Sequence, residues 1–196
     1  SCYWDKKLTV NLTLFQMDIH NQQLIQYPPA AAGFFFKNIG SARNWGLEVE
    51  IFARPLRGLE ILAGFGLVES SYITAYDEAS GTNYAGNRIP FAPRFTYNLA
   101  AQYRLLLGSN FSLFARIELN GVGSTSWDVA NSVSSGSYHL LNARVGIESK
   151  HVDIHFFARN LLDKVYESAV FVFPGADPLA VPGTPMYFGA MCTFWI

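Results

Sequence analysis

The stretch GNRIPFAPRFTYNLAAQYR at residues 86–104 shows how this chain is built. Its first half is stiff, because Pro90 and Pro93 fix φ and remove two backbone donors. Its second half alternates with a period of two, with an unbroken apolar side from Phe95 to Leu105 and a mostly polar opposite side. A long loop at about residues 75–86 precedes this strand, and a tight turn near residues 108–110 follows it. The unit is one long loop, one strand and one short turn.

The same unit repeats along the chain. Period-two alternation predicts about eight antiparallel, up-and-down strands, at about residues 7–20, 43–53, 59–72, 95–105, 111–121, 138–148, 152–160 and 187–196. Short turns join them at residues 55–58, 108–110 and 149–151, and all of these turns fall at one end of the predicted sheet. Long loops take the other end, at about residues 21–33, 75–86, 123–137 and 162–185. Short turns at one end and long loops at the other are typical of transmembrane β-barrels.

Aromatic side chains gather near the long-loop ends of the predicted strands. A membrane barrel carries such residues as a girdle at the level of the lipid headgroups. The candidates for this girdle are Tyr72, Tyr76, Tyr84, Phe91, Trp127, Tyr138, Tyr166 and Phe171.

The composition limits the classes of protein to which this chain could belong. The chain has 196 residues and a mass of 21.8 kDa, which suits one domain. Its 14 basic and 15 acidic residues give no electrostatic support for binding nucleic acid. Half of the residues are hydrophobic and only 15% are charged, against roughly 25% in soluble proteins. The longest apolar runs, such as residues 61–68, fall far short of the roughly 18 residues that a membrane-spanning helix needs.

Alternation alone leaves open whether the apolar face is a soluble core or a lipid contact. The polar face carries charges of both signs in strand after strand, and these residues are predicted to line a wet lumen: Glu48, Glu50, Arg104, Arg116, Glu118, Arg144, Glu148 and Arg159. The apolar face carries almost none, and a charge facing lipid at the midplane costs about 2–4 kcal/mol. The pattern therefore favours a membrane barrel over a soluble barrel or sandwich.

Five motifs occur in order along the predicted strands. They are NWGLEVE at residues 44–50, GNRIPFAPR at 86–94, LLNARVG at 140–146, ARNLLDKVY at 158–166 and YFGA at 187–190. Together they resemble the C-terminal barrel segment of TonB-dependent outer-membrane receptors. The resemblance covers residues 43–196 well and residues 7–42 loosely.

The resemblance implies a location, a function and partners. Members of this family form barrels of about 22 strands with a plugged lumen. They take up ferric siderophores, cobalamin or similar nutrient complexes across the outer membrane of Gram-negative bacteria. The implied partners are outer-membrane lipid, the barrel-assembly machinery, the remainder of the barrel with its plug, and TonB. No cofactor and no nucleic acid is implied.

We expect residues 1–196 to be the C-terminal part of such a barrel, with the plug domain and the TonB-contacting segment upstream of Ser1. Eight strands of so wide a barrel should form an open sheet with unpaired edges near residues 8–18 and 188–195. The family usually ends on Phe or Trp, whereas Ile196 follows Trp195 here, which puts the efficiency of assembly in question.

Ligand contacts are predicted on the long loops, where rigid amphipathic rings suit the recognition of large solutes. The candidates are Tyr76, Tyr84, Arg88, Trp127 and Phe171. For Arg88 and its neighbour Arg94, the alternative to an anionic ligand is pairing with the loop acids Asp77 and Glu78.

Structural roles explain the other candidate residues. Asp153 and His155 share a face and suggest a proton relay or half a metal site, but polarity of the wall explains them better, and no catalytic, metal or cofactor site is predicted. Asn160 and Asp163 suggest turn chemistry. Cys2 and Cys192 form a disulfide or remain unpaired.

Two other function classes stay open. One is a small standalone barrel with a structural or adhesive role, since eight strands can close by themselves. The other is an outer-membrane barrel enzyme that uses Asp153 and His155.

Overall fold

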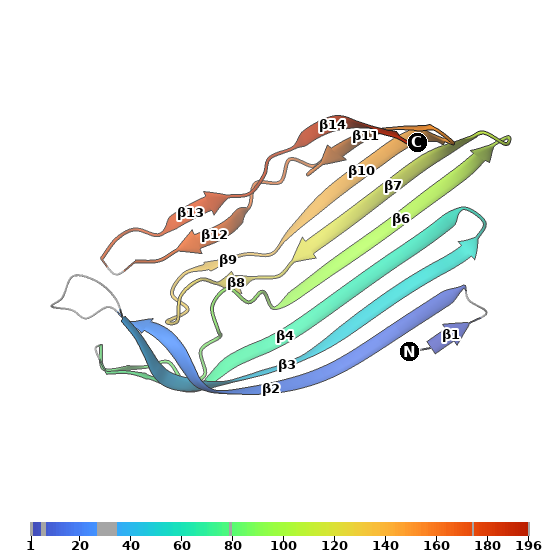
Figure 1. Cartoon of the computed structure of the whole chain (residues 1–196). Helices are drawn as coiled ribbons and strands as arrows, with labels where there is room; N and C mark the ends of the chain where they lie inside the picture. Colours follow the sequence, from blue (N-terminus) through green and yellow to red (C-terminus); the bar gives the residue numbers. More distant parts are fainter. Residues whose placement is uncertain (1, 5–6, 27–34, 79, 174, 196) are drawn as a thin grey trace.

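The computed structural model describes residues 2–4, 7–26, 35–78, 80–173 and 175–195. The long strands form one curved, antiparallel sheet (Figure 1). Its eight long strands are β2 (Leu8–Gln26), β3 (Phe35–Leu56), β4 (Leu59–Asp77), β6 (Phe95–Leu107), β7 (Phe111–Val122), β10 (Tyr138–Ser149), β11 (Val152–Arg159) and β14 (Tyr187–Phe194). The prediction of an all-β, up-and-down fold is confirmed. Within the described ranges no helix is long and apolar enough to cross a membrane.

The sheet is open, as expected. Its strand order is β1-β2-β3-β4-β6-β7-β10-β11-β14, and the described strands include no ladder between the first and the last. One detail of the expectation was wrong: β1 (Cys2–Trp4) pairs with Leu8–Val10 and covers the start of the β2 edge. The short turns lie together at one end of the sheet and the long loops at the other (Figure 1).

Strand pairing divides the sheet into two faces, because residues opposite each other in a ladder point to the same side. On one side Leu99 of β6 faces Ala63 of β4 and Leu119 of β7. We call this side the apolar face, and it includes Leu12, Leu14, Leu47, Phe65, Leu99, Ile117, Val145 and Phe156. We call the opposite side, on which Asn98 faces Asn120, the charged face.

One close contact on the apolar face depends on a glycine. The ring of Tyr97 lies over Gly121, where an added Cβ would come within 2.1 Å of a ring carbon. Gly121 pairs with both Tyr97 and His139, so it lies between these two side chains. The Tyr97 hydroxyl and His139 Nδ1 form a hydrogen bond of 2.8 Å across it. The glycine thus permits an aromatic pair at the loop end of the apolar face.

The first hairpin is longer than its sequence pattern predicts. Residues 21–26 continue β2, so the loop predicted at residues 21–33 is wrong in its first part, and residues 27–34 lie outside the described part. Asn21 adopts a positive φ of 56° within an irregular stretch of the β2–β3 ladder between Ile19 and Gln23. β4 likewise runs to Asp77 instead of ending at Tyr72. Both extensions lack an apolar alternation, although their backbone ladder continues the sheet.

The long loops contain short strands that the sequence did not predict. They are β5 (Thr82–Asn83), β8 (Thr125–Ser126), β9 (Ser134–Ser135), β12 (Glu167–Phe171) and β13 (Leu179–Pro182). β8 pairs with β9, and β12 pairs with β13. Strands of two to five residues are too short for a period of two to be recognised.

A small core lies at the loop end of the charged face. Ala42, Tyr72 and Ala75 are buried there, and Tyr84 and Val129 of two loops pack against them. The interpretation of Tyr72 as a girdle residue is therefore wrong, because its ring is covered by loop residues and only 2% of it is exposed. This core fixes the position of the loops above the wall.

Candidate functional site

The eight predicted wall residues share one face of the sheet. Cross-strand pairs set this face: Asn11 lies opposite Glu50, Arg116 opposite Arg144, and Ser112 opposite Glu148. Arg159 continues the alternation of β11 on the same side. The assignment of this face to a lumen stays a prediction.

Four of the eight wall residues form ion pairs with one another. Arg104 donates to Glu148 at 2.6 Å. Arg116 donates from Nε to Glu118 at 3.2 Å and from Nη1 to Gln102 at 2.9 Å. Gln102 in turn donates to Glu60 at 2.6 Å. The charged face is thus a hydrogen-bonded ladder that runs across β4, β6, β7 and β10.

Phe114 supports a group of cations on this face. Its ring is buried, and the guanidinium carbon of Arg144 lies 4.7 Å from its centroid. The guanidinium carbon of Arg104 lies 5.6 Å from the same centroid. His155 is buried edge-on to the ring, with Nε2 3.7 Å from a Glu148 oxygen. Cation–π contact compensates Arg144, for which the described residues offer no carboxylate within 4.0 Å.

Asp153 and His155 do not act as a pair. Asp153 accepts hydrogen bonds from the Ser149 amide at 3.1 Å and from the Trp195 indole at 2.8 Å. His155 contacts Phe114 and Glu148 instead. Within the described ranges, no group of three His, Cys, Asp or Glu side chains is placed to hold a metal ion. Cys192 is a free, exposed thiol, and the side chain of Cys2 lies outside the described part.

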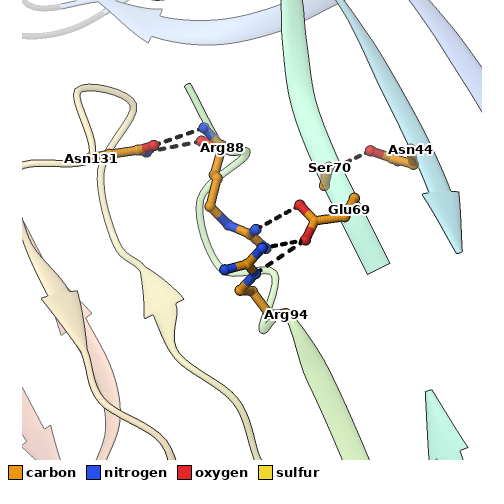
Figure 2. A network of polar contacts seen from close by, with 6 residues as sticks. All are labelled: Asn44, Glu69, Ser70, Arg88, Arg94 and Asn131. Carbon is orange, nitrogen blue, oxygen red and sulfur yellow. Dashed lines mark hydrogen bonds and ion pairs between the residues drawn. The ribbon is translucent and has the colours of Figure 1, made fainter. Parts of the chain in front are cut away.

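At the loop end, Arg88 and Arg94 converge on one carboxylate (Figure 2). Arg88 donates to Glu69 Oε2 at 3.0 Å, and Arg94 donates to Oε1 at 2.6 and 3.1 Å. The prediction that Arg88 and Arg94 pair with Asp77 and Glu78 is therefore wrong. Asp77 accepts from Ser80 at 2.7 Å, and Glu78 pairs with Lys37. One sequence signal pointed to Glu69: it is an acidic residue at a position of its strand where apolar residues alternate.

The predicted ligand-contacting residues differ in their surroundings. Tyr76 and Phe171 are exposed, and Tyr84 is half-buried against the small core. Trp127 is buried and donates its indole N–H to Ser135 at 2.6 Å. Arg88 is held by Glu69. The structure therefore leaves Tyr76 and Phe171 as the most accessible candidates, and contact with a ligand stays a prediction for all five.

Each loop contacts its neighbour. Lys37, at the start of β3, pairs with Glu78, which joins the first hairpin to the second loop. The Asn131 side chain accepts from the Arg88 amide at 2.7 Å and donates to its carbonyl at 2.9 Å, which joins the second loop to the third (Figure 2). Ser135 donates to Glu167, joining the third loop to the fourth. These contacts form a continuous belt around the rim.

Turn chemistry holds the base of the last loop, as predicted. Asn160 is buried at a φ of 49°, and its side chain accepts from the Lys164 amide at 2.9 Å. The same side chain donates to the carbonyls of Lys164 and Thr184 at 2.9 and 3.1 Å. Asp163, at a φ of 48°, accepts from the Met186 amide at 3.0 Å. Both residues thereby tie the two ends of this loop together.

A family model described as "TonB dependent receptor-like, beta-barrel" matches residues 3–161 of the chain. The chain belongs to the TonB-dependent receptor family. This membership locates the receptor in the outer membrane of a Gram-negative bacterium, and the matched relatives are receptors and transporters, not enzymes.

Two curated relatives illustrate the similarity of sequence. The receptor chain is 28% identical over 145 residues to the ferrichrome outer membrane transporter/phage receptor of Escherichia coli K12, covering 70% of the chain and 18% of that protein. It is 26% identical over 133 residues to the pesticin receptor of Yersinia pestis, covering 67% of the chain and 19% of that protein. The chain thus spans about a fifth of the length of these relatives.

Solved structures share the fold. The ferric yersiniabactin uptake receptor FyuA of Yersinia pestis matches with a TM-score of 0.79 at 21% identity, over 97% of this chain and 28% of its own. The ferric citrate transporter FecA matches with a TM-score of 0.69 at 21% identity, over 96% of this chain and 29% of its own. The receptor chain therefore has the fold of part of such a barrel.

Proposed function

We propose that residues 1–196 form the C-terminal part of the barrel of a receptor that takes up a ferric siderophore or a similar nutrient complex. The observation that carries this proposal is the alternation of β6, β7 and β10 between an apolar face and a hydrogen-bonded charged face, in a chain of this family. The names of relatives point to the cargo, since they include ferrichrome and ferric yersiniabactin.

The proposal orients the wall. The apolar face contacts outer-membrane lipid, because exposed side chains such as Leu14 and Phe156 have no other described partner there. The charged face lines the lumen, where wet charges cost little. The long loops lie outside the cell and the short turns lie in the periplasm.

The partners follow from this orientation. The remainder of the barrel pairs with the free edges at β2 and β14, because unpaired backbone groups cannot face lipid. A plug fills the lumen and connects the receptor to TonB. The barrel-assembly machinery acts on β14. No cofactor and no nucleic acid takes part.

The open sheet favours this reading over a standalone barrel. A closed barrel of eight strands would require β14 to pair with β2, whereas the described residues of these strands make no such ladder. The geometry does not favour a barrel enzyme that uses Asp153, because this carboxylate accepts a hydrogen bond from the Trp195 indole.

Deletion of the gene that contains this reading frame tests the proposal. Growth on a panel of ferric siderophores as the sole iron source, with and without the intact gene on a plasmid, is the measurement. We expect growth on at least one siderophore to be lost and restored by the plasmid. Equal growth of all strains on iron complexes, and on cobalamin in a cobalamin-requiring background, would contradict it.

A further inference from the structure

A hollow of about 800 Å³ opens at the end of the sheet where the short turns lie (Figure 1). Its lining includes Gln102 and Arg104 of β6 and Phe114 of β7. Gln102 lies opposite Arg116 in the ladder, and Arg104 lies opposite Phe114, so these side chains belong to the charged face. The start of β2 and the β3–β4 turn complete the lining, with Lys7 and residues 54–60. The hollow therefore opens on the side of the proposed lumen.

Cations outnumber carboxylates in this hollow. The lining holds one carboxylate, that of Glu60, and four cations: Lys7, Arg54, Arg57 and Arg104. Arg54 pairs with Glu60 at 2.8 Å, and Arg104 pairs with Glu148 of the neighbouring wall at 2.6 Å. For Lys7 and Arg57 the described residues offer no carboxylate within 4.0 Å. Four cations against two carboxylates leave two positive charges.

These cations are accessible from the hollow. The side chains of Arg54 and Arg104 are 58% and 48% exposed. Lys7 and Arg57 are exposed as well. Because the described part of the wall pairs neither Lys7 nor Arg57 with a carboxylate, an incoming partner can bind both without breaking an ion pair of the wall.

Exposed leucines lie among the cations. Leu106 of β6 is opposite Ser112 on the charged face and is 55% exposed. Leu56 of the β3–β4 turn lines the same hollow and is 54% exposed. Such side chains in a wet lumen are stabilised when another surface covers them. Apolar residues with arginines among them are typical of the surface that one protein segment presents to another.

We propose that this hollow binds a segment of the plug that carries at least two carboxylates and an apolar side chain. The inference rests on the proposed function, which places a plug in the lumen. The two carboxylates pair with Lys7 and Arg57, and the apolar side chain covers Leu56 and Leu106. The hollow is large enough for such a segment, since pockets of about 300–1,000 Å³ enclose most of a drug-sized ligand.

The position favours a polypeptide over a lipid or a passing solute. Under the proposed orientation lipid contacts the opposite face, where Leu105 pairs with Leu113. A transported solute must leave again, so it does not remain to cover Leu56 and Leu106. A segment of the plug stays in the lumen and covers both leucines in the resting receptor.

The test uses the full-length receptor in outer-membrane preparations, with the photoreactive residue p-benzoylphenylalanine in place of Leu106. Illumination followed by mass spectrometry identifies the molecule that touches the hollow. We expect a cross-link to a plug peptide that contains at least two aspartates or glutamates. The same photoreactive residue in place of Lys150, on an exposed short turn outside the hollow, is the matched control and should not cross-link to this peptide.

Charge variants test the chemistry of the contact. Lys7→Glu combined with Arg57→Glu should lower the yield of the cross-link from position 106 about fivefold, because two exposed ion pairs are lost. Lys150→Glu reverses a charge at the same end of the sheet and should leave the yield unchanged. Lysine in place of the two acidic residues of the cross-linked peptide should restore the yield in the double variant. Heat-modifiability on gels confirms that each variant is folded.

Four results would overturn the inference. The first is a cross-link only to phospholipid, to a second copy of the receptor or to a separate periplasmic protein. The second is a plug peptide without acidic residues, and the third is no cross-link from position 106 in a folded receptor. The fourth is an equal yield from the Lys7 and Arg57 double variant and from Lys150→Glu.

The outcome is independent of transport. A receptor that takes up its nutrient but gives no plug cross-link from position 106 contradicts this inference alone. A receptor that gives the cross-link with the expected charge dependence but supports no uptake contradicts the proposed function alone.

Discussion

Arg104 of β6 and Glu148 of β10 are joined by two hydrogen bonds, of 2.6 and 3.1 Å, although β7 lies between their strands. Ser112 of β7 lies under the pair and donates to the same carboxylate at 3.4 Å. The contact therefore ties three strands together on the charged face, close to the short turns. Glu148 is 17% exposed, so the pair is shielded more than an ordinary surface ion pair.

Removal of this pair should weaken the wall. We expect Arg104→Ala and Glu148→Ala each to lower the free energy of unfolding by about 1–3 kcal/mol, because a charged hydrogen bond to a half-buried carboxylate is lost. The more exposed pair Arg54–Glu60 is the control, worth about 0–1 kcal/mol. Urea unfolding of the receptor in lipid vesicles, with a double-mutant cycle for each pair, gives these values. Equal coupling energies for the two pairs would contradict the expectation.

The orientation of the faces predicts opposite effects of neighbouring substitutions. Leu47→Arg and Val145→Arg should block membrane insertion, because an arginine facing lipid near the midplane costs about 2–4 kcal/mol. Glu48→Arg and Arg144→Glu change the charge by two units each, but they lie on the charged face and should be tolerated. Outer-membrane fractionation with heat-modifiability gels compares the four variants. If the second pair is the damaging one, the apolar face is not the lipid face.

Gly121 should not accept a larger residue. Gly121→Ala would place a Cβ about where the Tyr97 ring lies, so the ring must move and its bond to His139 breaks. We expect a loss of about 1–3 kcal/mol in the free energy of unfolding, the usual cost of overpacking. Gly64→Ala is the matched control, since a Cβ there meets nothing within 4 Å. Urea unfolding that shows equal effects would indicate that the Tyr97 contact does not constrain the wall.

Asn160 should control the last loop. Asn160→Ala removes three hydrogen bonds and places alanine at a positive φ, so the base of the loop should open. Limited proteolysis with mass spectrometry should then show faster cleavage within residues 161–186. Asn160→Gly keeps the backbone conformation but loses the bonds, and it separates the two causes. Unchanged cleavage in both variants would show that other contacts hold the loop.

The chain by itself should bind no nutrient ligand. A binding site on the rim needs loops from the whole barrel and the plug, and this chain covers about a fifth of its relatives. Its free strand edges should also pair with other copies, so the refolded chain should aggregate in detergent. Titration with a panel of ferric siderophores and cobalamin, alongside light scattering, tests both statements. Saturable binding at micromolar concentration or below, or a monodisperse monomer, would count against them.

The sequence predicts best where water and lipid act on opposite sides of a strand. In strands such as β6 and β10 this contrast produces a period of two, which is why their bounds and faces could be read from residues 86–104 and 138–148. Above the apolar band polar and apolar residues no longer alternate along the strand, so nothing in the pattern marks the extension of β2 to Gln26. The burial of Tyr72 was missed for a related reason, since it depends on loop residues that approach from elsewhere in the chain.

The partner of Arg88 is a part of the candidate site that could not be predicted from the sequence. Spacing along the chain suggested the nearby acids Asp77 and Glu78, but the loop runs back along β4 and delivers both arginines to Glu69. The motif at residues 86–94 gave the right residues and the wrong partner. Only the path of the backbone, which pairs Ser71 with Arg88, decides which carboxylate and which face they meet.

The contacts between neighbouring loops have a mechanical consequence. Lys37–Glu78, Arg88–Asn131 and Ser135–Glu167 connect the first hairpin and the next three loops in series, and the last of these loops is anchored at Asn160. A force applied to one of these loops by an arriving solute is therefore shared by the other two and by the first hairpin. The connected segments of the rim should therefore move together. Large movements should be confined to the loop tips beyond these connections.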